Sequence, residues 1–133
     1  MKKLFGYSLC ALLLVGCTSA PQVDEDEIQM NIQVQNKDTQ EVLFDETVTA
    51  SGETLADFLE DAEELDVEME DGEYGKKIIS ILDLKTEDWN KGPWWVYESE
   101  DNKTCKEAGM CPAASDVVVE DGDHFTFTFT STF

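Results

Sequence analysis

The feature that most constrains the fold of this chain is the period of its apolar residues, which changes along the sequence. Apolar and polar residues alternate strictly over Ile28–Gln35 and again over Phe125–Thr130, as they do in half-buried β-strands. Between these segments, residues 54–65 carry apolar side chains at spacings of three and four, which predicts an amphipathic helix. Strands at both ends of a domain with one helix between them predict an α+β fold.

The predicted helix has a defined start and one apolar face. Thr54 followed by Asp57 fits a capping box, which fixes the expected N-terminus. The apolar face consists of Leu55, Phe58, Leu59 and Ala62, with Leu65 as a further candidate. A helix of about three turns is expected, packed on a sheet through this face.

Shorter segments supply the other predicted strands. They are Val42–Val48, with Val42, Phe44 and Val48 on one face, then Val67–Glu70, Ile78–Leu82, Trp94–Tyr97 and Val117–Val119. Polar loops are expected over Asp83–Lys91 and Glu98–Ser115. This order of elements predicts a β-grasp-like α+β domain, in which a mixed or antiparallel sheet wraps around the single amphipathic helix.

Residues 1–16 have the layout of a bacterial lipoprotein signal peptide. Lys2 and Lys3 precede the mostly apolar run Leu4–Val15, which is too short to span a bilayer unaided. The run ends in Gly16 and Cys17, the small-residue-then-cysteine pattern of a bacterial lipobox. We expect cleavage before Cys17, lipidation of its thiol, and anchoring at the extracytoplasmic face of a cell membrane. An ordinary secretory signal that happens to contain a cysteine is the alternative. Residues 17–27 would then form a lipidated acidic tether, and residues 28–133 a single domain.

The charge of the chain excludes one class of partner. The sequence has no arginine, and its formal charge of −21 becomes −23 once residues 1–16, which hold Lys2 and Lys3 and no acid, are removed. Binding to nucleic acid requires cationic side chains that neutralise phosphates. No nucleic-acid partner is therefore expected.

Cys105 and Cys111 are the cysteines that remain after cleavage and lipidation. In an exported chain, two cysteines so close in sequence are expected to form a disulfide that stiffens a loop. A metal site is the alternative, but two thiols with no histidine near them in sequence make a poor zinc set. No metal is therefore predicted.

Neither catalysis nor calcium binding is predicted. His124 is the one histidine in the sequence, and no serine or cysteine stands out as its partner. The acidic segments Glu70–Glu73 and Glu120–Asp123 lack the spaced oxygen ligands of an EF-hand loop, and hairpin turns on an acidic surface explain both. We expect a protein that is not an enzyme and has no catalytic cofactor.

The candidate binding residues are aromatic and centre on Gly92–Tyr97. In a strand, Trp94 and Trp95 must face opposite ways, and Tyr97 shares the face of Trp95. One tryptophan is therefore expected in the core and the other on the surface, where it can stack on a planar ligand. Trp89 lies in the preceding loop and would mark an interface if it is exposed.

An ordered series of motifs runs through the domain. It comprises Ser51-Gly52-Glu53-Thr54-Leu55 with Phe58-Leu59, then Tyr74-Gly75, Ile79-Ser80-Ile81, Trp94-Trp95-Val96-Tyr97 and Val119–Asp123. In this order the motifs resemble the family of transcobalamin-like C-terminal domains, a module that bacterial lipoproteins carry. The module is similar to the small β-domain of transcobalamin and intrinsic factor, and the resemblance covers residues 28–133.

The resemblance implies a binding role for the aromatic strand. In the vitamin carriers, the β-domain closes over cobalamin held against a larger helical barrel, and the positions of Trp94 and Trp95 lie close to the ligand. The loop matching Tyr74 and Gly75 also lies on the ligand side. This chain departs from the family, because Val96 replaces the family's glutamine and the helical barrel is missing.

Two functions follow as expectations. The resemblance implies a lipoprotein that binds a small molecule, cobalamin or a related corrinoid, and passes it to a membrane transporter. The alternative is a surface module that contacts protein or glycan through the aromatic strand and the cysteine loop.

Overall fold

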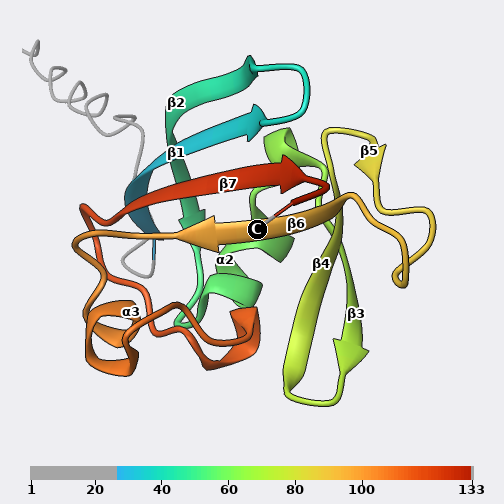
Figure 1. Ribbon diagram of the computed structural model, residues 1–133. Helices are drawn as coiled ribbons and strands as arrows, with labels where there is room; N and C mark the ends of the chain where they lie inside the picture. The colour runs from blue at the N-terminus through green and yellow to red at the C-terminus, as the bar shows by residue number, and fades with distance from the viewer. Residues whose placement is uncertain (1–26, 133) are drawn as a thin grey trace, which may run out of the picture.

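The computed structural model describes residues 27–132 (Figure 1). The predicted signal peptide, the lipidation site Cys17, residues 17–26 of the predicted tether and Phe133 lie outside the described residues. Within residues 27–132, no helix has the length and apolar character needed to cross a membrane.

The described residues form seven strands, two α-helices and two short 3-10 helices, labelled η. The strands are β1 (Glu27–Asn36), β2 (Glu41–Ser51), β3 (Glu68–Gly72), β4 (Gly75–Ile81), β5 (Leu84–Lys85), β6 (Trp94–Glu98) and β7 (His124–Thr130). The helical elements are α2 (Leu55–Asp61), η2 (Glu63–Leu65), α3 (Lys103–Ala108) and η3 (Ala114–Asp116).

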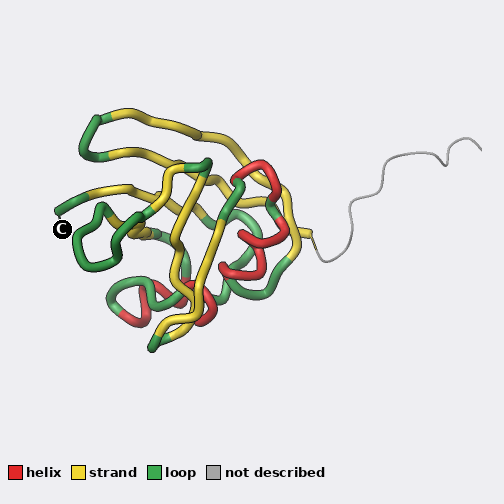
Figure 2. The backbone as a smooth tube through the Cα atoms, turned by 90° about the vertical axis from the view of Figure 1, so that its right-hand side faces the viewer, coloured by secondary structure: helices red, strands yellow, loops and turns green. Residues whose placement is uncertain are grey.

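The strands divide into two sheets. The larger sheet has the order β2-β1-β7-β6, in which β1 and β7 are parallel and the other two pairs are antiparallel. The smaller sheet is antiparallel, with the order β3-β4-β5. Figure 1 shows β3 and β4 running across the direction of β1 and β7, and Figure 2 shows the long strands side by side with helical turns beside and below them.

The predicted mixed α+β class is confirmed, but the expectation of one sheet around one helix is wrong. The β3-β4 hairpin pairs with β5 and not with the larger sheet, so the strands form two sheets. A second helix, α3, occupies part of the predicted loop Glu98–Ser115. Val117–Val119 is not a strand, because only Val118 forms a β-bridge, to Thr54.

The predicted helix forms, although it is shorter than expected. The Thr54 side chain accepts a hydrogen bond from the Asp57 amide, as the capping box requires, and α2 then ends at Asp61. Its predicted apolar face is buried in full, and Leu65 is buried on η2. The helix is shorter because the chain tightens into a 3-10 turn after Ala62.

Aromatic side chains of β7 dominate the core between the sheets and α2. Phe125, Phe127 and Phe129 are all buried, as the alternation predicts, but Thr128 and Thr130 are buried as well, so the second half of β7 is not the half-buried strand that was expected. Burying a phenylalanine side chain contributes about 1.5–3 kcal/mol. Val42 does not join the core as predicted: it is 58% exposed, because β2 is an edge strand whose first half extends past the packed region.

Candidate functional site

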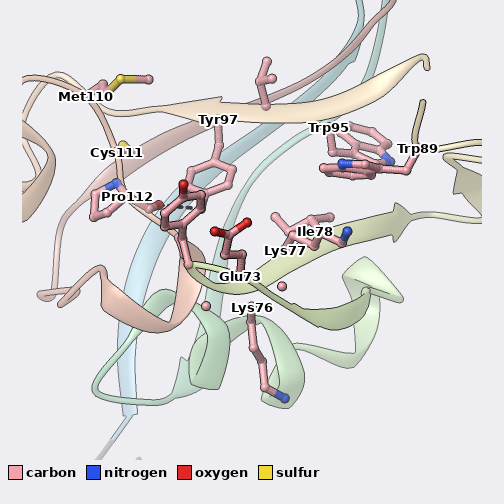
Figure 3. A pocket seen from close by; sticks show the side chains of 15 residues that line it. Glu73, Lys76, Lys77, Ile78, Trp89, Trp95, Tyr97, Met110, Cys111 and Pro112 are labelled. Carbon is pink, nitrogen blue, oxygen red and sulfur yellow. Dashed lines mark hydrogen bonds between the residues drawn. The ribbon is translucent and has the colours of Figure 1, made fainter. Parts of the chain in front are cut away.

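A cavity of about 510 Å³ lies between β4, β6 and two loops (Figure 3). Its lining includes Tyr74, Gly75, Trp89, Trp95 and Tyr97, so five of the six predicted binding residues meet there. The other lining residues are Gly72, Glu73, Lys76, Lys77, Ile78, Val96, Met110, Cys111, Pro112 and Ala113. The segments that meet here are far apart in sequence, and the cavity exists only in the folded chain.

Trp95 forms part of the floor of the cavity and belongs to the core. Its side chain is 4% exposed, its ring centroid lies 4.8 Å from that of Phe129, and its Nε1 donates a hydrogen bond to the Leu84 carbonyl at 2.8 Å. A buried indole must satisfy its N–H in this way. Trp95 is therefore the core tryptophan that alternation along the strand predicted.

Trp94 points to the other face of β6 and does not line the cavity. Its Nε1 donates to the Trp89 carbonyl at 2.6 Å. Its ring packs on Gly92 so closely that a Cβ there would lie 2.7 Å from it, and Gly92 has φ of +75°. Trp94 thus positions the loop that carries Trp89, and a direct ligand role for Trp94 remains a prediction.

Tyr97 connects the strand floor to the cysteine loop. Its hydroxyl donates to the Pro112 carbonyl at 2.6 Å, and its ring lies 5.7 Å from that of Phe127. Burial, with a smaller contribution from the carboxylate of Asp116, raises the pKa of Tyr97 to about 12. The phenol therefore remains neutral and acts as a hydrogen-bond donor at physiological pH.

The tip of the β3-β4 hairpin forms a second side of the cavity. Tyr74 is 81% exposed, and Gly75 has φ of +130°. A Cβ on Gly75 would lie 2.6 Å from the Ser115 hydroxyl oxygen and 2.8 Å from the Ala113 Cβ. Gly75 therefore allows a close approach of the backbone to a neighbouring segment, which here is η3.

Trp89 is 43% exposed and stands over Lys77, whose Nζ lies 4.0 Å from the centre of the indole. The loop around it is held by backbone hydrogen bonds from Lys91 and Gly92 to the Asp88 carbonyl, at 3.0 and 2.9 Å. The expectation that an exposed Trp89 marks a binding surface is compatible with this position at the cavity.

The predicted disulfide between Cys105 and Cys111 is present, and it closes the loop that carries Met110. Met110 is 76% exposed and lines the cavity beside Pro112. Sequence reasoning missed both residues. The available signal was their position on either side of Cys111, because a disulfide that stiffens a loop also fixes the residues next to it.

Asn102 caps the start of α3 and is fully buried beneath this loop. Its Nδ2 donates to the Asp123 carboxylate at 2.7 Å and to the Val118 carbonyl at 2.8 Å. Its Oδ1 accepts from the Cys105 amide at 2.9 Å, which caps α3. One side chain therefore joins α3 to the turn before β7.

Within residues 27–132, no group of three or more His, Cys, Asp or Glu side chains is placed to hold a metal ion. His124 contacts the Asp101 carboxylate at 2.7 Å, away from the cavity, and Ser99 binds the same carboxylate rather than the imidazole. Partial burial raises the pKa of Asp101, but hydrogen bonds from His124 and Ser99 outweigh it and hold that pKa below its usual range.

No protein-family model matches the chain, and no curated protein matches it in sequence. Solved structures resemble the fold, among them a bacterial protein and haptocorrin. A candidate metal-binding protein from Ruminococcus gnavus has a TM-score of 0.57 and 24% identity, over 80% of this chain and 99% of that protein. Haptocorrin in complex with Cbi has a TM-score of 0.59 and 18% identity, over 87% of this chain and 28% of haptocorrin.

At these identities the likeness establishes the fold, which is that of part of haptocorrin. The resemblance inferred from the sequence is therefore confirmed at the level of fold. Both neighbours are described through what they bind, and neither is described as an enzyme. The cavity itself is mostly apolar, with aromatic rings on several sides, which suits binding of a small molecule with a flat apolar surface.

Proposed function

We propose that this protein is a lipid-anchored, extracytoplasmic binding protein for a flat small molecule, and that a corrinoid is its ligand. The observation that carries the proposal is the meeting of Tyr74, Trp89, Trp95 and Tyr97 around one cavity. Aromatic side chains on several segments provide the apolar, flat contacts that a planar macrocycle requires. The likeness to haptocorrin in complex with the corrinoid Cbi supports this choice of ligand.

The cavity is open, and this affects the expected affinity. The chain matches 28% of haptocorrin, so the likeness covers only part of that protein. A single open domain covers one side of a large ligand and leaves the other side in water. We therefore expect micromolar binding by this protein alone, and tighter binding if a transporter in the same membrane covers the exposed side.

Equilibrium dialysis against cyanocobalamin and dicyanocobinamide tests the proposal. The full-length chain, extracted from membranes in detergent, is expected to bind at least one of them saturably. Trp89→Ala should weaken binding about tenfold, because a well-placed aromatic contact contributes 1–2 kcal/mol. Val42→Thr, on the exposed part of β2, is the control and should bind like the wild type. Absence of saturable binding of either compound would refute the corrinoid proposal.

A second function is favoured by a different observation. Tyr74, Trp89 and Met110 are all strongly exposed around the cavity, and such clusters also occur in protein and glycan interfaces. In this alternative, the protein contacts a protein or glycan at the cell surface and needs no small molecule. A glycan array probed with the wild type and with Trp89→Ala would support it if wild-type binding depends on Trp89 while corrinoids do not bind.

A further inference from the structure

Lys77 is placed unusually for a lysine in this acidic chain. The sequence has thirty acidic residues and nine lysines, and two of the seven lysines among residues 27–132 form ion pairs with carboxylates. Lys76 pairs with Glu60 at 3.0 Å, and Lys85 approaches Glu68 at 3.7 Å. Lys77 has no carboxylate within ion-pair distance among residues 27–132, and its ammonium lies over the Trp89 ring.

An acidic residue lies opposite Lys77 in the sheet but does not form an ion pair with it. Glu70 is directly opposite Lys77 in the β3-β4 pairing, where side chains on the same face approach closely. The Lys77 ammonium extends instead toward Trp89, and Figure 3 shows it beneath the tryptophan side chains at one end of the cavity. The side chain of its neighbour Lys76 points away from the cavity in the same view and pairs with Glu60.

A carboxylate in another part of the lining gives the two ends of the cavity opposite charges. Glu73 lines the cavity, and Figure 3 shows its side chain separate from the Lys77 ammonium. The two charges do not form an ion pair with each other. Their separation leaves one region of a mostly apolar cavity that favours anions and another that repels them.

We propose that Lys77, held on the Trp89 ring, binds an anionic group, a phosphate or carboxylate, carried by the flat ligand. This inference rests on the proposed function and specifies its ligand: a planar apolar body with a negative group at its edge. Glu73 repels that group and so orients the ligand with its anionic edge toward Lys77. Among corrinoids, this favours those with the phosphodiester of a nucleotide tail over those that lack it.

The same two corrinoids provide the test, because cyanocobalamin has the phosphodiester and dicyanocobinamide does not. In equilibrium dialysis with the full-length chain, Lys77→Met should weaken cyanocobalamin binding about tenfold, the effect expected for a charge-assisted hydrogen bond. Binding of dicyanocobinamide should be unchanged. Lys77→Arg should restore most of the cyanocobalamin affinity. Lys85→Met removes the same charge outside the cavity and should change neither affinity.

The outcomes separate the two proposals. If Lys77→Met weakens both ligands equally, Lys77 acts by holding Trp89 in place and the anion inference is wrong. If it weakens neither, Lys77 has no role in binding and the inference is again wrong, while the corrinoid proposal stands. If the wild type binds neither compound, both proposals fail. Thermal melting of each variant checks that loss of affinity is not loss of the fold.

Discussion

The floor and the rim of the cavity are built from different kinds of structure. The floor consists of strands: Trp95 on β6 and Ile78 on β4 are buried, and their backbones belong to hydrogen-bonded ladders. The rim consists of loops and a hairpin tip, and Tyr74, Trp89 and Met110 on it are exposed. The same cavity therefore combines side chains that stabilise the fold with side chains that do not.

The rim is fixed by a few point contacts rather than by a ladder. Trp94 binds the Trp89 carbonyl on one loop, Tyr97 binds the Pro112 carbonyl on the other, and the disulfide closes the second loop. Segments held by few bonds open locally at lower free energy than the core. Stability should therefore depend on the floor, and ligand affinity on the rim.

The sharpest test of this separation compares two tryptophans of the same cavity. Trp95→Ala removes a buried ring and should lower the free energy of unfolding by about 3–5 kcal/mol. Trp89→Ala should lower it by less than about 1 kcal/mol, because only its exposed ring and the contact with Lys77 are lost. Urea unfolding measures both. Equal destabilisation by the two substitutions would break the distinction between floor and rim.

Asn102→Ala should have the next largest effect, because Asn102 is a fully buried polar side chain that supports the cysteine loop of the rim. The substitution leaves the Val118 carbonyl and the Cys105 amide without the Asn102 side chain as hydrogen-bond partner. It also removes a hydrogen bond that the buried Asp123 carboxylate accepts. We expect a loss of about 3 kcal/mol in urea unfolding. Asn90→Ala, on an exposed part of the other loop, is the control and should change stability by less than about 0.5 kcal/mol.

The floor could be predicted from the sequence because its signals are local. Alternation in β1 and β7 and the apolar spacing in α2 depend only on neighbouring residues, and each places its apolar side chains correctly. Whether two groups of strands join into one sheet is not decided locally. β3, β4 and β5 pair with their sequence neighbours, but no local pattern shows that their sheet stays separate from the larger one, and this is why one sheet was expected and two are found.

The rim could be predicted only in part. Exposed aromatic residues such as Trp89 stand out in a sequence, whereas Lys77 does not, because its role depends on a tryptophan twelve residues away that folds over it. The helix α3 was missed because it is one and a half turns long and polar, held by the buried cap of Asn102 and the disulfide rather than by an apolar face.

Removing the disulfide should affect the rim more than the floor. In the chain-entropy account, a loop this short contributes about 2 kcal/mol, so Cys105→Ala with Cys111→Ala should lower the free energy of unfolding by that amount. Amide exchange of Gly109, Met110, Cys111 and Ala113 should accelerate more than that of β6 and β4. Equal acceleration in the strands would show that the disulfide stabilises the whole domain and not one side of the cavity.

The smallest expected effect comes from the contact that joins the two regions. Tyr97→Phe removes the hydrogen bond to Pro112 and should cost about 1 kcal/mol at pH 8. The pKa of Tyr97 is raised to about 12 in the folded protein, above the value near 10 of an unfolded chain. The neutral phenol therefore stabilises the fold fully below pH 10, and this contribution is lost as the pH rises through about 12. Urea unfolding at pH 8 and pH 11 should show wild type and Tyr97→Phe converging in stability at the higher pH. A difference that stays constant over this range would mean that Tyr97 ionises alike in the folded and unfolded chains, and that the floor does not shield it.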